Sequence, residues 1–493
     1  DFCLSRGLGD VYKRQVLEQG YGFVDSIAKL VPFKPGQLVT IEMAKKEEKQ
    51  LAERERNEDE VRQLLALAQQ LEGMTRNVGM HAGGVLIAPG KLTDFCPLYT
   101  QDSKDQDSSS VISQFDKDDV EAIGLVKFDF LGLTTLTILA AAERWIKALH
   151  ADRKDWSIGD ITLEDPAAFE VLKSANTVAV FQLESRGMQG MLRDAKPDRF
   201  EDIIALVALY RPGPMDLIPD FIARKHGRQQ VEYPDPRIEP VLRETYGIMV
   251  YQEQVMQMAQ MIGGYSLGGA DLLRRAMGKK KPEEMAQHRK IFSEGAKKGG
   301  ITEFKANEIY DLMERFAGYG FNKSHAAAYA LLAYQTAWLK AHYPAEFMAG
   351  NLSLAMDDTD KVKILYDDCL QNRLRVLPPD INTGTYEFTP LRTQGVPVDQ
   401  PLIDIRYGLG AVRGTGEAAI ESIVKARETG GPFTDLFDFC ARVDRRQVNR
   451  RAIEALMRAG AFDSLYAVGS NQKGKPYDIR STLLASLARA IEA

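Results

Sequence analysis

The chain has 493 residues, 44% hydrophobic and 27% charged, which excludes a largely disordered chain. A domain commonly holds roughly 100 to 200 residues, so we expect a globular protein of about three or more domains. The net charge of −6 excludes a surface coated with phosphate-binding residues, so any nucleic-acid site has to be local.

The cysteine spacing and the apolar runs also limit the class of protein. The four cysteines form no CxxC pair, so we expect neither a zinc site nor a disulfide framework, and a reducing, cytoplasmic setting. No apolar run reaches about 18 residues and no basic-then-apolar leader occurs, so we expect no membrane span and no secretory signal.

The predicted elements change in type along the chain. Apolar residues recur at helical spacing from 47 to 71, which predicts one amphipathic helix with Gly73 as its C-terminal cap. The apolar runs at 83–89 and 124–133 each predict a strand, and the two strands can pair in one sheet. Beyond residue 134 the pattern predicts long helices, at 136–149, 200–209, 253–262 and 325–342.

The second of these strands carries a candidate metal ligand. Side chains alternate along a strand, so Val126, Phe128 and Phe130 face one way, and Lys127 and Asp129 face the other. A carboxylate held rigidly on an apolar element suits Mg²⁺, which prefers carboxylate and phosphate oxygens in a fixed octahedral arrangement. A one-sided strand with a solvent-facing Lys and Asp accounts for the same pattern.

Positive charge is concentrated in three groups of residues. One group lies in the stretch 263–285, where flexible glycines precede a helix that carries Arg274 and Arg275. Such cations can bind a triphosphate or a DNA backbone, although an exposed basic helix is the alternative. No GxxxxGK[ST] motif occurs, so a P-loop ATPase is disfavoured. The groups are Arg274, Arg275, Lys279, Lys280 and Lys281; Arg224, Lys225 and Arg228; and Arg442, Arg445, Arg446, Arg450 and Arg451.

A glycine- and aromatic-rich turn precedes the last of the predicted helices. We expect Ser324 to be the N-cap of a helix that runs through His342 and stops before Pro344. The turn GYGFNKS offers backbone N–H groups, Lys323 and aromatic faces to a nucleotide. Core packing is the alternative for the aromatic residues of this helix and for His325.

The stretch 407–427, YGLGAVRGTGEAAIESIVKAR, predicts helix, hairpin and helix, with the hairpin at 413–416. In this pattern the hairpin glycines let backbone N–H groups approach a DNA phosphate without reading the base sequence. A structural hairpin that binds no DNA is the alternative.

Taken together, seven stretches resemble the bacterial DNA polymerase III alpha subunit, the C-family of replicative polymerases, over about residues 16 to 493. They are TRNVGMHAGGVLIAP (75–89), SQFDKDDVEAIGLVKFDFLGL (113–133), FQLESRGM (181–188), ALVALYRPGPM (205–215), YGIMVYQEQVMQMA (246–259), LGGADLLRRAMGKKKPEEM (267–285) and FAGYGFNKSHAAAYA (316–330).

The resemblance implies an α+β fold. It predicts part of a polymerase-beta-like nucleotidyltransferase palm with a thumb remnant, followed by large, mainly helical fingers with a helix-hairpin-helix motif. The expected parts are an unmatched junction at 1–15, a thumb-like helical segment at 16–79, the second half of the palm with the catalytic strand at 80–134, fingers at 135–400, and the helix-hairpin-helix with a C-terminal helical region at 401–493.

By the same resemblance the chain is a DNA-directed DNA polymerase that adds dNMP to a primer 3′-hydroxyl during chromosome replication. Three palm aspartates of that family hold two Mg²⁺ ions, and Asp129 matches one of them; Lys127 lies beside the metals. Two metals would lower the pKa of the 3′-hydroxyl and stabilise the leaving pyrophosphate. The residues implied for nucleotide binding are Arg274, Arg275, Lys279, Arg211, Asn322, Lys323, Ser324 and His325, and those for DNA binding are Arg413, Gly414, Thr415 and Gly416.

The N-terminus departs from the family pattern. Asp1 matches the second catalytic aspartate and would be a further metal ligand, but the first aspartate of the pair would lie upstream, and residues 4–15 do not match. We therefore expect an internal piece of the polymerase that is inactive by itself. The partners implied are primer-template DNA and dNTP. In the intact protein they also include a sliding clamp, a proofreading exonuclease and clamp-loader subunits, whose binding regions we expect to be absent. A non-catalytic DNA-binding scaffold is the alternative function.

Overall fold

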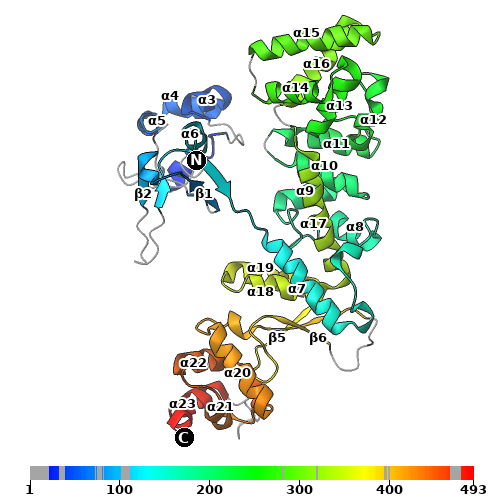
Figure 1. The fold of residues 1–493 in the computed structure, drawn as a ribbon. Helices are drawn as coiled ribbons and strands as arrows, with labels where there is room; N and C mark the ends of the chain where they lie inside the picture. The colour runs from blue at the N-terminus through cyan, green and yellow to red at the C-terminus, as the bar shows by residue number, and fades with distance from the viewer. Residues whose placement is uncertain are drawn as a thin grey trace. The chain divides into compact units, whose positions relative to one another are not determined.

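The computed structural model divides into two compact units, Asp1–Gly132 and Leu133–Ala493, each with its own hydrophobic core (Figure 1). It describes residues 21–32, 39–72, 74, 80–81, 83–100, 111–211, 213–279, 282–317, 320–392, 397, 400–466 and 479–492. Helices dominate the described residues and strands are few, in agreement with the mainly helical fold expected beyond residue 134. Within these ranges none of the helices combines the length and apolar character that a bilayer crossing requires.

The first unit begins with short helices rather than one long one. The single helix predicted over residues 47–71 is wrong: the chain leaves helical geometry at Glu48 and Glu58, whose φ angles are −106° and −121°. The Glu48 side chain accepts a hydrogen bond from the backbone N–H of Gln50, so it starts a new helix. The breaks let apolar side chains of successive helices share one core. These helices are α2 (Tyr21–Ala28), α3 (Ile41–Glu47), α4 (Lys49–Asn57) and α5 (Asp59–Gln70). Gly73, the expected cap, lies outside the described residues.

The two predicted strands of this unit form and pair with each other. Strand β1 (Gly84–Ile87) runs antiparallel to β4 (Val126–Asp129), with Gly84 opposite Asp129 and Ile87 opposite Val126. A second two-stranded sheet pairs β2 (Leu98–Thr100) with β3 (Val111–Ser113), and α6 (Lys117–Ala122) precedes β4. The expected pairing is therefore confirmed.

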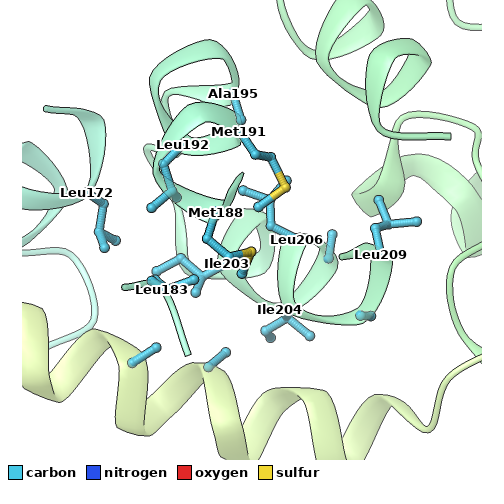
Figure 2. Packing of buried hydrophobic residues seen from close by; sticks show 14 of the residues in the cluster. Leu172, Leu183, Met188, Met191, Leu192, Ala195, Ile203, Ile204, Leu206 and Leu209 are labelled. Carbon is cyan, nitrogen blue, oxygen red and sulfur yellow. The ribbon is translucent and has the colours of Figure 1, made fainter. Parts of the chain in front are cut away.

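The second unit has a helical core built around α17 (Lys323–His342), which packs along α8 (Pro166–Lys173) and α10 (Phe200–Leu209) (Figure 1). Figure 2 shows the apolar side chains that fill this core, contributed mainly by α8, α9 (Arg186–Ala195) and α10. Burying each of these side chains stabilises the fold by about 1.5 to 3 kcal/mol before the opposing chain entropy. The helices predicted at 136–149, 200–209, 253–262 and 325–342 all form, within two residues of the expected ends.

Three further cores complete the second unit. One core joins α12 (Glu239–Leu242), α13 (Gln252–Gly263), α14 (Leu267–Lys279), α15 (Pro282–Lys298) and α16 (Glu303–Ala317). The α-helix that precedes this group in the sequence is α11 (Ile218–Lys225). Another joins α7 (Thr134–Leu149), α18 (Pro344–Leu354), α19 (Thr359–Gln371) and a sheet in the order β5-β7-β6, formed by β5 (Arg375–Leu377), β7 (Asp404–Arg406) and β6 (Thr389–Leu391). The last joins α20 (Glu417–Gly430), α21 (Leu436–Arg442), α22 (Arg450–Ala459) and α23 (Ile479–Glu492).

Candidate functional site

Asp129 ends β4 opposite Gly84, where any larger residue would crowd the carboxylate. A Cβ added to Gly84 would lie 3.3 Å from Oδ1 of Asp129 and 2.9 Å from Nδ1 of His81. A Cβ on Gly83 would lie 2.4 Å from the carbonyl oxygen of Phe130, which is closer than real Cβ atoms come. Any larger side chain at these positions would fill the space next to the carboxylate or push the strands apart.

Lys127 controls the charge state of this carboxylate. Its Nζ forms an ion pair with Oδ2 of Asp129, two residues further along the same side of the strand. The hydrogen bond from Lys127 holds the pKa of Asp129 below its usual value against the opposing effect of burial, and the nearby charge of His81 acts in the same direction as Lys127. Asp129 is therefore ionised at neutral pH, the state in which it can bind a metal ion.

The apolar side of the β1–β4 sheet is the more exposed one. Val126, Phe128 and Phe130 are 57%, 49% and 66% exposed, whereas the Lys127 and Asp129 side chains are 23% and 30% exposed. The interpretation as a one-sided strand with only Lys127 and Asp129 in solvent does not describe this arrangement.

Asp129 fits one ligand position of a divalent cation, because it is ionised and its side chain is 30% exposed. Among the residues that the structure describes, no three His, Cys, Asp or Glu side chains gather closely enough to hold a metal ion. Asp1, the second ligand expected from the sequence, lies outside the described residues.

In the second unit, the N-terminus of helix α17 is capped by Asn322 rather than by Ser324. The extended backbone of Asn322 brings its Oδ1 within 2.8 Å of the backbone N of His325, which donates to it. Ser324 lies inside the helix, so its predicted role as N-cap is wrong. Asn and Ser serve equally well as N-caps, and the composition alone did not separate them.

Lys323 is held at both ends by acidic residues. Its backbone N donates to both carboxylate oxygens of Glu253, at 3.1 and 3.0 Å, and its Nζ lies 2.7 and 2.8 Å from those of Glu244. The ammonium group also lies 5.4 Å from the centre of the buried Tyr251 ring. Glu253 thus already serves as the anion at the N-terminus of α17, where the helix dipole favours negative charge.

The two arginines of α14 share one partner but differ in their surroundings. Asp271 lies 2.7 Å from Nη2 of Arg274 and 2.9 Å from Nε of Arg275. These contacts lower the pKa of Asp271, and the hydrogen bond from Arg274 is the largest cause. The Arg274 side chain is 28% exposed and also donates to Oε1 of Gln252 at 3.2 Å, whereas Arg275 is 64% exposed. The Lys279 side chain lies outside the described part of the chain.

Aromatic rings gather at the turn before α17. The guanidinium carbon of Arg211 lies 4.6 Å from the centre of the Phe321 ring, and burial lowers the pKa of Arg211. The His325 ring lies 5.3 Å from that of Phe321 and 4.2 Å from that of Tyr329. His325 is exposed, so it does not pack in the core, and its ring contacts remain compatible with a structural role.

The structure thus brings Arg211, Arg274, Asn322, Lys323 and His325 to one turn. Two residues that bind members of this group were not predicted from the sequence, Gln252 and Glu253 in the first turn of α13. The sequence does mark these two polar residues, because they directly follow the apolar run GIMVY. Their partners in the turn before α17, however, lie about 70 residues further along the chain.

The predicted helix-hairpin-helix differs in its first part. The segment before the hairpin is a short 3-10 turn, η8 (Leu409–Ala411), and not an α-helix. Gly408 and Gly410 lie so close to the Tyr386 segment that an added Cβ atom on either would strike it. Gly414 has a φ of +99°, which favours glycine, and the Thr415 hydroxyl donates internally to Leu409 and Val412. Arg413, Gly414 and Gly416 are exposed.

These features define a mainly helical protein with a helix-hairpin-helix module, and comparison with known proteins identifies its family. Residues 8–132 match the "Bacterial DNA polymerase III alpha NTPase domain", 135–300 the "Bacterial DNA polymerase III alpha subunit finger domain", and 373–473 the "Helix-hairpin-helix motif". The first match begins within the 4–15 segment.

Individual relatives give the same result. DNA polymerase III subunit alpha of Neisseria meningitidis serogroup B is 56% identical over 451 residues, which cover 92% of this chain and 38% of the relative. The protein of the same name from Xylella fastidiosa (strain Temecula1) is 56% identical over 460 residues, covering 92% and 38%, and that from Escherichia coli K12 is 51% identical over 488 residues, covering 97% and 40%. The chain belongs to the bacterial DNA polymerase III alpha subunit family, and it spans about two fifths of the length of these relatives.

Proposed function

We propose that this chain contributes to template-dependent addition of deoxynucleotides to a primer 3′-hydroxyl, with a nucleotide-binding turn before α17 and a metal-binding aspartate on β4. The observation that supports this most directly is that cations from distant parts of the sequence contact the turn or a residue bound to it: Arg211 lies over the Phe321 ring, Arg274 binds Gln252, which holds Gly320, and Lys323 begins α17. Preorganised cations suit a triphosphate, because catalysis of phosphoryl transfer depends mainly on positioning and charge stabilisation.

Within this proposal Asp129 holds one of two Mg²⁺ ions of a polymerase-beta-like palm, together with Asp1 and a further aspartate. The bound metals supply Lewis-acid activation of the 3′-hydroxyl and stabilisation of the leaving pyrophosphate. Lys127 lowers the pKa of Asp129, and the absence of a side chain at Gly84 avoids crowding of the carboxylate.

The remaining polymerase roles follow from the family assignment. Arg275, Lys279, Asn322, Ser324 and His325 complete the proposed nucleotide site, and residues 413–416 contact the DNA backbone through hairpin N–H groups. Sliding clamp, proofreading exonuclease and clamp-loader subunits are proposed partners of the intact protein. The free thiols of Cys96, Cys369 and Cys440 suit a reducing cytoplasm.

A thermal-shift experiment tests the nucleotide site. The chain is heated with Mg²⁺ alone, with dNTP alone and with both, and we expect the melting temperature to rise when both are present. A ligand at 100 times its dissociation constant stabilises the folded state by about 2.7 kcal/mol. Arg274→Ala should abolish the rise. A chain that binds duplex DNA but shows no shift with Mg²⁺ and dNTP would support the rival function, a DNA-binding scaffold.

A further inference from the structure

Gln252, the first residue of α13, makes three hydrogen bonds that join two distant segments. Its backbone N donates to the carbonyl oxygen of Phe321 at 2.9 Å, and its Nε2 donates to that of Gly320 at 3.0 Å. Its Oε1 accepts from Nη1 of Arg274 at 3.2 Å. One side chain therefore spans from the turn before α17 to the arginine on α14.

The fit between Gln252 and the turn leaves little room for another arrangement. A Cβ added to Gly320 would lie 3.0 Å from Cγ of Gln252 and 3.5 Å from its Cα. Next to this contact, Tyr251 and Phe321 form a parallel β-bridge that fixes the position of the turn relative to the start of α13. The amide suits both partners, because its NH₂ faces a carbonyl oxygen and its oxygen faces a guanidinium.

Arg274 has a second, competing anchor on its own helix. Asp271, one turn earlier on α14, binds the Nε and Nη2 of Arg274 and also Arg275. Among the described contacts of the Arg274 side chain, the one with Gln252 reaches outside α14, whereas the one with Asp271 is an intrahelical contact that Arg275 also makes. The hydrogen bond with Gln252 therefore distinguishes Arg274 from Arg275, because it directs Nη1 of Arg274 towards the turn.

The neighbouring residue completes this arrangement. Glu253 accepts hydrogen bonds from the backbone N of Lys323 and from Nδ2 of Asn322 at 3.1 Å. The first turn of α13 thus fixes Arg274 through one residue and the start of α17 through the next.

We propose that Gln252 is a positioning residue for nucleotide binding: it aligns Arg274 with the 320–322 turn before the nucleotide arrives. A fixed guanidinium loses less conformational entropy on binding phosphate than a free one does. The proposal rests on the proposed role of Arg274 in holding the triphosphate.

A double-mutant cycle tests the proposal in a polymerase extended to the full length of the relatives. The variants are Gln252→Met, which keeps the length but forms no such hydrogen bonds, Arg274→Ala, and the two combined. We expect Gln252→Met to raise the KM for dNTP roughly tenfold, with a smaller change in kcat, since a hydrogen bond to a charged group is lost. The double variant should be no worse than Arg274→Ala alone, because Gln252 acts through that arginine.

A control and a second variant separate positioning from general damage. Gln257→Met, an exposed residue on α13, should leave the KM unchanged. Gln252→Glu keeps an acceptor for Arg274 but places a carboxylate oxygen against the carbonyl oxygen of Gly320, so it breaks the link to the turn and should raise the KM as Gln252→Met does. The affinity for primer-template DNA should stay the same in all of these variants.

The outcomes distinguish the two proposals. If Arg274→Ala raises the KM but Gln252→Met does not, or if the two effects multiply in the double variant, the positioning role is overturned and the nucleotide site stands. A parental KM in Gln252→Glu would also overturn it, because the contact with Arg274 would then suffice without the link to the turn. If Arg274→Ala leaves the KM unchanged, the nucleotide site itself is refuted.

Discussion

Replacing Asp129 by Asn tests the metal role of the β4 strand. The substitution keeps the shape of the side chain, and the register between Gly84 and Asp129 is maintained by the backbone, so the sheet should be unaffected. What is lost is the negative charge that Lys127 pairs with and that a metal ion would bind. We expect polymerisation by a full-length version of the protein to fall at least about 100-fold, or ~2.7 kcal/mol of transition-state stabilisation, with DNA affinity changed less than about twofold.

The assay is single-turnover primer extension, with DNA affinity measured on the same preparations. Asp118→Asn, which removes an exposed carboxylate from α6 in the same unit, is the matched control and should extend primers at the parent rate. Residual extension by Asp129→Asn above about a tenth of the parent rate would refute the metal assignment, since a factor of ten is only ~1.4 kcal/mol.

Three further substitutions test the electrostatics and the hairpin. Lys127→Met removes the main cause of the low pKa of Asp129, so the loss of activity on acidification should begin at a higher pH in a pH–rate profile. At Gly416 the space for an added Cβ is open and φ is an ordinary −104°, so Gly416→Ala avoids the strain that alanine would cause at Gly414. We expect this substitution to weaken the binding of unrelated duplexes equally, by about 1 kcal/mol. Unchanged binding would indicate a structural hairpin. Asp368→Asn leaves the ammonium group of Lys340 buried without its ion-pair partner and should lower the free energy of unfolding by about 3 to 5 kcal/mol in urea titrations, whereas the same change at exposed Asp367 should have almost no effect.

The local pattern of the sequence predicted the elements that carry the candidate residues. Alternation along Val126–Asp129 predicted both the strand and the common side of Lys127 and Asp129, and the structure adds their ion pair. The long helices beyond residue 134 were predicted as well, because their apolar periodicity extends over several turns. Where the signal was a single residue, as in the choice of Ser324 as N-cap, the prediction was wrong.

The joining contacts could not be predicted, because they depend on where distant segments meet. Gln252 and Gly320 are 68 residues apart, and nothing in the local composition of either segment specifies the other. The same holds for the break at Glu58, where a charged side chain compatible with a helix lies in extended backbone so that α4 and α5 can share a core. Propensity is a weak guide wherever tertiary packing decides the outcome.

The acidic residues around the turn before α17 explain how several cations can stay together without a ligand. Arg274 faces Asp271, and Lys323 faces Glu244, so each positive charge is compensated within the second unit. The two pairs are partly exposed, and exposed ion pairs of this kind typically contribute only about 0 to 1 kcal/mol. A triphosphate carries several negative charges and accepts stronger, charge-assisted hydrogen bonds, so it can replace these carboxylates at little cost to stability. Glu253 differs, because it accepts from the backbone N–H of Lys323 in the first turn of α17, and its removal would leave that N–H without this partner. Under the proposed nucleotide role, a triphosphate would displace Asp271 and Glu244, whereas Glu253 would stay bound to the start of α17.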